Sequence, residues 1–572
     1  SAKREHGGVD FGDLILFPTR LLETDEAVRL NIQLRHRHVL VDEYQDVNRA
    51  SARLLQLLAG AGERLWVVGD ARQSIYRFRG ASGLNMGHFA MDYPGAKIDR
   101  LEINYRSVDQ IVQAFGDFSK QMLASVGMLP LALTATRGAC KHTPEIRSFE
   151  TLDDEIGGVA ASIKEIESTG IRLRDQAVLC RTNARLNEIA LGLENRGIPV
   201  LHLGSLFERD EVRDLLAMLA FIGDNSGGGL VRLAAMERYS IRLQDVYCVL
   251  RHFRESGDRA QWNLTTAIDG VSSEGSIALA RLWEDVGGFN ASMNPWDIAL
   301  TYLFDKTDGV RRFALDTSVS SQMKAVALWQ FLNFLRKPSP IRHGSPIMRL
   351  LDHVRQLVLL AEERDLRQVP AAALGLNAVR LMTVHGSKGL EFEAVHIPGL
   401  TVAGFPSSNR WERCPCPTGM IEGSDGNSKD TQAEEEECLF FVALSRAKDR
   451  LLISHAMKQR NGNARNVSAY LSRLSRVARK DAGSTQVLKA TAPQGQPYII
   501  PISLPSEWLL TDSKLTTFEK CPRRFFYTHV LGLRSARKGT AFSRTHDCLY
   551  ELISRIHAKR LVGAPTQAEI LF

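Results

Sequence analysis

The chain has 572 residues, of which 44% are hydrophobic and 24% are charged, and its formal net charge at pH 7 is +7. These values are ordinary for globular proteins and exclude a disordered tail, a collagen-like rod and a disulfide scaffold, while about 100–200 residues per domain predict several domains. No run of about 18 uncharged apolar residues occurs, so no membrane span is predicted, and eight scattered cysteines favour a reducing, cytoplasmic environment.

The first hundred residues alternate short apolar strands with an amphipathic helix. Residues 38–41 and 65–68 predict buried parallel strands, and the leucines of residues 50–58 recur at helical spacing between them. A strand, a helix and a strand with polar residues at the strand ends are typical of a doubly wound α/β domain. A second α/β stretch covers about residues 145–205, with a strand at 176–180.

From about residue 207 to 370, helical patterns replace the strand pattern. Strands return at residues 379–384, 394–397 and 450–454, so a helical block is predicted to be inserted into an α/β domain. The turn-rich stretch that follows carries four prolines between residues 493 and 505 and predicts a linker. A final segment begins near Asp512.

Two adjacent acids, Asp42 and Glu43, end the first predicted strand within the run Val-Asp-Glu-Tyr-Gln-Asp. Such a pair suits nucleotide hydrolysis, since one carboxylate can hold Mg²⁺ and the other can orient or deprotonate a water molecule. A bare acidic pair is also what an ordinary polar strand end contains. Four later blocks decide between these interpretations: residues 69–81, 104–107, 383–392 and 435–448.

The block after the second strand combines an amide that can sense phosphate, aromatic side chains that can stack on bases, and arginines. Together and in this order, the five blocks resemble motifs II to VI of the UvrD/Rep family of superfamily 1 DNA helicases, over about residues 9–455. The resemblance implies an α/β fold of RecA-like P-loop NTPase domains, which are doubly wound parallel sheets, with a mainly helical inserted subdomain. It also implies ATP and Mg²⁺ in the cleft between two such domains, and single-stranded DNA across their top.

By this resemblance the catalytic residues are Glu43, Arg106 and Arg446. Asp42 would hold Mg²⁺, Glu43 would activate water, and Gln73 would report on the γ-phosphate. Arg106 and Arg446 would reach the γ-phosphate from the second domain, a task that suits planar and permanently charged guanidinium groups.

The other site residues follow from the same resemblance. Tyr105 would stack near the adenine, and Glu391 matches the acidic residue that contacts the ribose or couples the cleft to the DNA. The implied DNA contacts are two stacking aromatics and two residues that link the ATP cleft to the DNA backbone: Tyr76, Phe78, Thr383 and His385. Phe78 stands where relatives often carry Trp.

A phosphate loop of the form G-x-x-x-x-G-K-[ST] does not occur in the 572 residues. In the family this loop lies well upstream of the acidic block, whereas only about forty residues precede Asp42 here. We therefore expect an N-terminally truncated helicase, whose full gene product is an ATPase. The present chain is expected to be impaired, because the backbone amides and lysine of that loop are the main anchor of the nucleotide.

Residues 512–533 resemble the opening of the PD-(D/E)xK nuclease domains that are fused to RecB- and AddB-like helicases. His546 would assist metal binding in such a domain, and Cys521 aligns with the first iron–sulfur cysteine of the AddB-type subset. The sequence ends at Phe572 before the Asp and Glu-x-Lys residues and the later cysteines that such sites need. We therefore expect an incomplete nuclease-like domain, with neither nuclease activity nor an iron–sulfur cluster.

The expected organisation runs from part of a first RecA-like domain through a divided second one to the nuclease-like segment: residues 1–108, then 109–206 and 376–470 around an inserted subdomain at 207–375, a linker at 471–511, and 512–572. The expected function is that of an ATP-dependent DNA helicase or translocase with 3′ to 5′ polarity, acting in DNA repair or recombination. Its partners would be ATP, single-stranded or duplex DNA and recombination-complex subunits. Two alternatives stay open: a non-catalytic DNA-binding or interaction module with helicase architecture, and the helicase half of a RecB/AddB-like helicase–nuclease.

Overall fold

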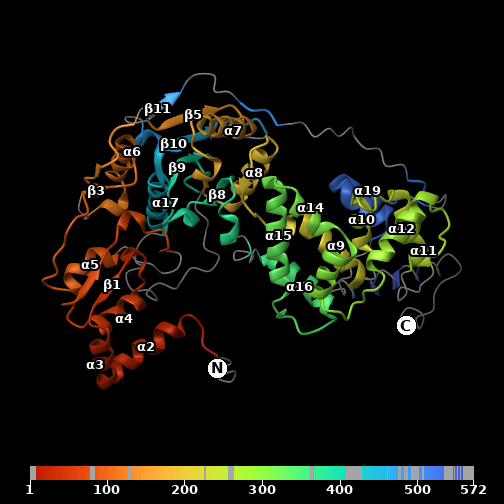
Figure 1. The fold of residues 1–572 in the computed structure, drawn as a ribbon, viewed down its shortest axis with the longest axis horizontal. Helices are drawn as coiled ribbons and strands as arrows, with labels where there is room; N and C mark the ends of the chain where they lie inside the picture. Colours follow the sequence, from red (N-terminus) through yellow and green to blue (C-terminus); the bar gives the residue numbers. More distant parts are fainter. Residues whose placement is uncertain are drawn as a thin grey trace. The chain divides into compact units, whose positions relative to one another are not determined.

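The computed structural model describes residues 8–77, 84–126, 130–140, 142–223, 227–255, 263–360, 366, 369–407, 428–459, 461–474, 478–481, 487–490, 502–504, 508–533, 545, 548–549, 552–553 and 556–557. The chain forms two compact units (Figure 1). Unit 1 comprises Ser1–Gly204, Ser318–Met323 and Arg367–Gln494, and unit 2 comprises Ser205–Thr317, Lys324–Leu366 and Gly495–Phe572. None of the described helices combines the length and the apolar composition that a membrane crossing requires.

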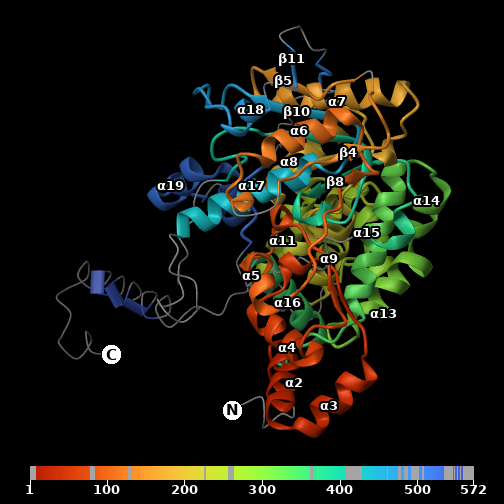
Figure 2. The same ribbon diagram turned by 90° about the vertical axis from the view of Figure 1, so that its left-hand side faces the viewer.

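Unit 1 begins with a small parallel sheet of β1 (Val39–Val41) and β2 (Leu65–Val67). The connecting helix α4 (Arg49–Ala59) starts at Asn48, whose side chain accepts a hydrogen bond from the Ser51 backbone N–H. Helices α2 (Asp13–Thr24) and α3 (Glu26–Arg35) pack against α4 (Figure 2). The predicted order of strand, helix and strand is confirmed, and both strands end where the sequence turns from apolar to acidic or glycine-containing.

The rest of unit 1 is built on a seven-stranded sheet in which every pairing is parallel, in the order β11-β5-β10-β9-β6-β8-β7. Its strands are β5 (Glu145–Phe149), β6 (Gln176–Cys180), β7 (Val200–Leu201), β8 (Val379–Thr383), β9 (Phe392–Ile397), β10 (Ala447–Ala456) and β11 (Arg479–Asp481). A separate short pair, β3 (Ile103–Asn104) and β4 (Thr134–Ala135), lies after α5 (Leu84–Asp92). Non-sequential neighbours in the large sheet are typical of a doubly wound fold.

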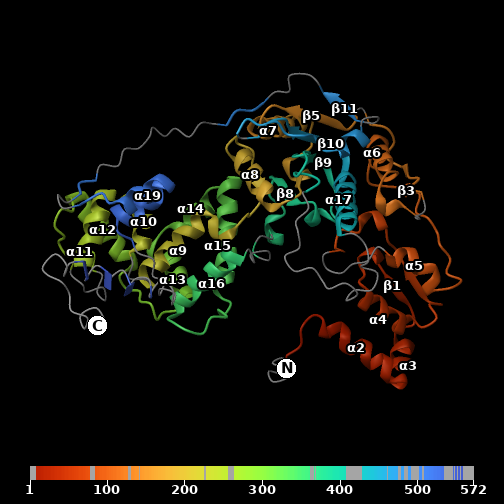
Figure 3. The ribbon, with the colours of Figure 1, turned by 180° about the vertical axis from the view of Figure 1, so that it is seen from behind.

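Helices cover both faces of this sheet (Figure 3). Along β6 the side chains alternate: Ala177 and Leu179 pack with α6 (Asp109–Ser119) and α17 (Ser428–Leu444), while Val178 and Cys180 pack with α7 (Leu152–Ser168) and α8 (Asn183–Glu194). Because successive side chains of a strand point to opposite faces, a strand buried on both sides is apolar throughout. The predicted α/β fold class is confirmed.

One part of the predicted linker differs from the expectation. Residues Arg479–Asp481 form β11, which pairs with β5 at the edge of the large sheet. The run Arg-Lys-Asp has no apolar residue, and a polar edge strand of this length carries no periodic signal that sequence analysis can detect.

Unit 2 is helical in its described part, as predicted for the inserted block. Most of it consists of α9 (Asp210–Gly223), α10 (Gly228–Ala235), α11 (Leu243–Glu255), α12 (Ser273–Val286), α13 (Pro295–Leu300), α14 (Gly309–Leu315), α15 (Val319–Leu335) and α16 (Pro346–Leu360). Helix α15 begins within the residues assigned to unit 1. The same unit includes α19 (Asp512–Lys520) and α20 (Pro522–Phe525) near the C-terminus.

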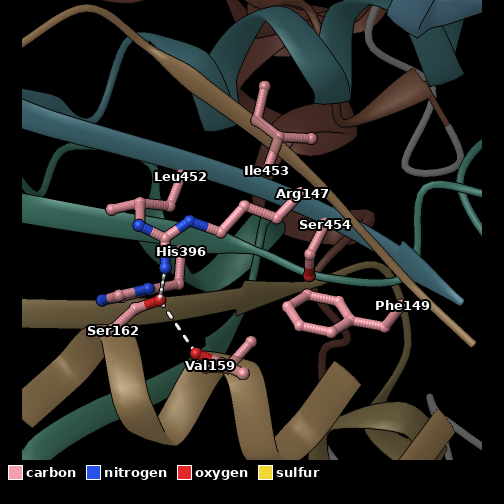
Figure 4. A pocket seen from close by; sticks show the side chains of 9 residues that line it. Arg147, Phe149, Val159, Ser162, His396, Leu452, Ile453 and Ser454 are labelled. Carbon is pink, nitrogen blue, oxygen red and sulfur yellow. Dashed lines mark hydrogen bonds between the residues drawn. The ribbon is translucent and has the colours of Figure 1, made fainter. Parts of the chain in front are cut away.

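A cavity of about 10 Å³ lies between the large sheet and α7 (Figure 4). Its lining includes Arg147, Ser162 and His396. The volume is about that of one water molecule, so the cavity cannot hold a nucleotide. His396 is 1% exposed, and burial together with the nearby Arg147 and Arg450 lowers its pKa to about 3.

This buried histidine predicts a pH-dependent stability. In the folded chain His396 stays neutral at pH values below its ordinary pKa of 6.5, whereas in the unfolded chain the same side chain binds a proton. The part of the free energy of unfolding that depends on His396 is therefore fully present above pH 6.5. It decreases by about 1.4 kcal/mol per pH unit as the pH falls toward 3. Urea unfolding should show a shallower pH dependence for His396→Gln than for the wild type, whereas exposed His142→Gln should leave the dependence unchanged. Equal slopes for His396→Gln and wild type would contradict this account.

Candidate functional site

The acids Asp42 and Glu43 directly follow β1. Asp42 is exposed, and its Oδ1 accepts the Glu43 backbone N–H at 2.9 Å. Glu43 has a φ of 53°, which is the left-handed region that non-glycine residues seldom adopt. Its side chain is 46% exposed, and its Oε2 accepts a hydrogen bond from the Gln45 side-chain amide. The backbone at Glu43 is therefore strained, and the hydrogen bond from Gln45 fixes the position of the Glu43 carboxylate.

The loop after β2 is joined to the loop after β1 by Gln45. Gln45 Oε1 accepts the Asp70 backbone N–H at 3.0 Å, and a Cβ at Gly69 would lie 2.6 Å from the same oxygen. Asp70 caps the turn η2 (Ala71–Gln73) by accepting the Arg72 N–H, and its Oδ2 accepts from Gln73 Nε2 at 3.1 Å. The side chain of Gln73 is thereby positioned by Asp70, which lies in the loop after β2.

A turn after β8 faces these two loops within unit 1. It comprises η10 (His385–Ser387), and it begins at Thr383, whose Oγ1 accepts the Gly386 N–H at 3.3 Å. The Tyr76 hydroxyl donates to the His385 carbonyl at 3.5 Å, and the two rings lie 6.3 Å apart between centroids. The structure thus brings together Tyr76, Thr383 and His385, three of the residues implied to contact DNA.

Lys388 connects this turn to the acidic loop. Its ammonium lies 2.5 Å from Asp46 Oδ2 and 3.2 Å from Glu43 Oε2, and it donates to the Gln73 carbonyl at 3.0 Å. Burial raises the pKa of Asp46, while the contact with Lys388 acts in the opposite direction. Lys388, Asp46 and Gln45 are not among the site residues predicted from the sequence. All three lie inside the motif blocks, but no local signal distinguishes them from their neighbours.

Arg106 and Glu391 form a second charged cluster in unit 1. Arg106 Nε donates to Glu391 Oε2 at 2.8 Å, and its Nη1 donates to the Ser445 carbonyl at 3.2 Å. Lys448 Nζ lies 3.0 Å from the other oxygen, Glu391 Oε1. The hydrogen bonds from Arg106 and Lys448 lower the pKa of Glu391, so this carboxylate is ionised at neutral pH.

Arg446 follows α17 and is 2% exposed. Its guanidinium donates to the Val442 carbonyl, the Leu390 carbonyl and the Ser445 hydroxyl, at 3.1, 3.2 and 2.8 Å. Among the described residues, no carboxylate lies within 4.0 Å of it. Burial and the charge of Arg106 lower the pKa of Arg446 to about 10, while Glu43 and Glu391 favour its charged form. A buried cation held by neutral acceptors is well prepared to meet an added anion.

The other predicted residues are placed as follows. Tyr105 is 73% exposed, so its ring is open to solvent beside Arg106. Cys521 is exposed, and its sulfur accepts the Arg524 N–H at 3.4 Å as the N-cap of α20. Phe78 and His546 lie outside the described residues.

The chemistry of the acidic loop fits Mg²⁺ bound together with a nucleotide. Mg²⁺ is usually held by one or two carboxylates plus phosphate and water oxygens, and Asp42 offers an exposed carboxylate beside Glu43. Within the described ranges, no group of three or more His, Cys, Asp or Glu side chains is arranged to hold a metal by itself. The site therefore suits a metal that arrives with phosphate ligands.

Two known protein families match this chain, and together the matches cover most of it. Residues 1–94 match the family described as UvrD/REP helicase N-terminal domain. Residues 100–242 and 272–458 match the family described as UvrD-like helicase C-terminal domain, which is more than half of the 572 residues.

Individual relatives agree with these matches. The chain is 29% identical over 460 residues to the ATP-dependent DNA helicase PcrA of Bacillus subtilis, covering 78% of this chain and 58% of the relative. It is 28% identical over 462 residues to the protein of that name from Staphylococcus epidermidis, covering 78% and 59%. The protein of that name from Leuconostoc citreum is 27% identical over 471 residues, covering 79% and 58%. The chain thus spans less than two thirds of the length of these relatives.

Proposed function

The chain belongs to the family of UvrD-like helicases, and we propose that it is the motor part of an ATP-dependent DNA helicase or translocase. We further propose 3′ to 5′ polarity and a role in DNA repair or recombination. The observations that carry the proposal are the acidic pair Asp42 and Glu43 at the end of β1 and the buried Arg446 after α17, whose guanidinium is held by neutral acceptors. Carboxylates that can hold Mg²⁺, and a guanidinium that has no carboxylate within 4.0 Å among the described residues, suit the binding of a phosphoryl group.

The proposed roles at the phosphates follow from the chemistry of each group. Asp42 holds Mg²⁺, which when bound neutralises negative charge on the phosphates. Glu43 orients the attacking water and accepts its proton. Gln73, fixed by Asp70, senses the terminal phosphate through its amide. Arg446 and Arg106 meet the charge that spreads over the oxygens of the leaving phosphoryl group.

Two further residues are proposed to contact the nucleoside. The exposed ring of Tyr105 offers a flat surface for the adenine. Glu391, kept ionised by Arg106 and Lys448, can accept a hydrogen bond from a ribose hydroxyl. Because Glu391 also fixes Arg106, nucleoside contact and phosphate contact share one cluster.

Single-stranded DNA is proposed to lie along the turn after β8. Tyr76 and Phe78 would stack on bases, and Thr383 and His385 would contact the backbone. The placement of Tyr76 against the His385 carbonyl supports a common surface for these groups.

Efficient hydrolysis is proposed to need a phosphate loop, which the 572 residues lack. We therefore expect the present chain to hydrolyse ATP slowly, and we propose to test the mechanism in a form to which such a loop has been joined, the loop-containing form. A loop-containing form that binds DNA but does not hydrolyse ATP would instead support a non-catalytic module.

The recombination role is proposed because residues 512–533 resemble a nuclease-like opening. Helix α19 starts at Thr511, whose hydroxyl accepts the Lys514 N–H, and α20 starts with Pro522 at its first position. We propose that these helices begin a PD-(D/E)xK-like domain and that subunits of a recombination complex are partners. Degradation of DNA ends by a form of the protein in which these helices are followed by a full PD-(D/E)xK domain would test this, and unwinding without any degradation would contradict it.

The 572-residue chain should bind single-stranded DNA in a salt-dependent manner. For a fluorescent oligothymidylate, the logarithm of the association constant should fall by about 0.7 per phosphate contact for each unit rise in the logarithm of salt concentration. Tyr76→Leu should weaken binding by about tenfold, because base stacking on an aromatic ring is worth roughly 1–3 kcal/mol. Fluorescence anisotropy measures both effects, with the exposed Phe11→Leu as the control. No binding at low salt, or binding that ignores salt, would contradict the proposal.

A further inference from the structure

The Lys388 side chain, on the turn after β8, is held by groups of both the acidic loop and the loop after β2. Its side chain is 7% exposed, and the ammonium contacts Asp46 Oδ2, Glu43 Oε2 and the Gln73 carbonyl. It also lies 5.3 Å from the centroid of the Tyr76 ring. A lysine ammonium has three N–H donors, and three acceptors surround this one.

The contact with Glu43 concerns the proposed catalytic carboxylate itself. Glu43 Oε2 is approached by the Lys388 ammonium at 3.2 Å and also accepts from the Gln45 amide. An oxygen that already accepts from these two donors has little capacity left for a water proton. In this arrangement the protein occupies Oε2 and fixes the direction of the carboxylate, so that Oε1 is the oxygen left to meet water.

Lys388 belongs to the same short turn as the residues proposed to contact DNA. The Lys388 N–H donates to the His385 carbonyl at 3.4 Å, and the Tyr76 hydroxyl donates to the same carbonyl. A displacement of His385 is therefore transmitted to Lys388 over a single turn. Ion pairs at these distances weaken steeply when one partner moves.

We infer that Lys388 is a positioning residue that holds Glu43 in a resting state, and that single-stranded DNA bound at His385 withdraws the ammonium and frees the carboxylate. This inference rests on the proposed function, since it needs the turn after β8 to be the DNA surface. DNA would then stimulate hydrolysis by releasing a contact, in addition to any ordering of the cleft. In the resting state the ammonium also pairs with Asp46 Oδ2, and the second oxygen of Asp46, Oδ1, is buried without a hydrogen-bond partner among the described residues.

Reductive methylation of the 572-residue chain, followed by mass spectrometry of peptides, tests this inference. Lysine 97 is 83% exposed in its side chain and supplies the internal reference. In the free chain Lys388 should react at least about tenfold more slowly than Lys97, because burial and ion pairing both protect the amine. Saturating oligothymidylate should raise the Lys388 rate by about fivefold or more and leave the Lys97 rate unchanged.

A variant separates ion pairing from simple burial. The double variant Glu43→Gln and Asp46→Asn keeps the size of both side chains but removes their charges, so Lys388 should react faster without DNA and respond less to it. Equal protection of Lys388 in this variant and in the wild type would overturn the inference. So would a Lys388 rate that does not change when DNA is bound, because a lysine with a purely structural role would show that behaviour.

Binding of the same oligothymidylate is followed in parallel by anisotropy, which separates the two failures. If DNA binds and the Lys388 rate is constant, only the release mechanism is wrong. If DNA does not bind, the proposed DNA surface is wrong and the inference falls with it.

Discussion

Replacement of Glu43 by glutamine is expected to lower DNA-stimulated ATP turnover of the loop-containing form by about 10²–10⁴-fold while nucleotide still binds. Glutamine has the size of glutamate, but its amide cannot accept a proton from water. The amide nitrogen would also repel the N–H donors of Gln45 and Lys388 that contact the Glu43 carboxylate. Nucleotide affinity should change little, because the main phosphate contacts are made by other groups. Phosphate release and binding of a fluorescent nucleotide measure the two properties separately.

A matched control for this variant is Glu63→Gln, which changes an exposed glutamate before β2. It should leave both turnover and nucleotide binding unaltered. Near-normal turnover in Glu43→Gln would remove this residue from the mechanism, and a parallel loss of nucleotide binding would assign it to the binding of ATP or Mg²⁺ instead.

Replacement of Arg446 by lysine is expected to reduce hydrolysis by roughly 10²–10³-fold in the loop-containing form, with a much smaller effect on nucleotide affinity. A guanidinium can span two phosphoryl oxygens, whereas an ammonium acts as a single point charge. Arg446 is held in place by two carbonyls and a hydroxyl, and lysine cannot reproduce that set of hydrogen bonds. Single-turnover kinetics distinguish the chemical step from binding.

The exposed Arg53→Lys is the control for the arginine variant, since Arg53 pairs with Glu23 on the surface of the N-terminal helices. Thermal unfolding of both variants checks that the buried position tolerates the change. If Arg446→Lys keeps its turnover and loses about tenfold in nucleotide affinity, Arg446 binds the ground state and the proposed role is incorrect.

The sequence was sufficient for the parts of the fold that have strong local patterns. Strand β6 matches its predicted range of residues 176–180, because the four apolar residues after Gln176 form a short run bounded by polar residues and are buried on both faces of the sheet. A joint role of Glu43 and Arg446 could be anticipated only through the family resemblance, since these residues are about four hundred positions apart. No local pattern links residues so far apart in the sequence.

Two features could not be predicted for physical reasons. The position of Lys388 depends on the three-dimensional approach of the turn after β8 to the acidic loop, and the sequence around Lys388 looks like an ordinary glycine-flanked turn. Strand β11 is a polar edge strand whose pairing is determined by the backbone of β5 rather than by its own side chains. Both features arise from tertiary contacts that periodicity does not encode.

The most direct test of the proposed function is the rate of phosphate release from ATP by the loop-containing form, measured with and without single-stranded DNA. We predict that DNA raises this rate by about tenfold or more, since coupling between two sites typically spans about 5–150-fold. The same measurement on Glu43→Gln sets the background. A rate that is the same with and without DNA, in protein that anisotropy shows to be DNA-bound, would contradict the assignment of this chain to a DNA-stimulated motor.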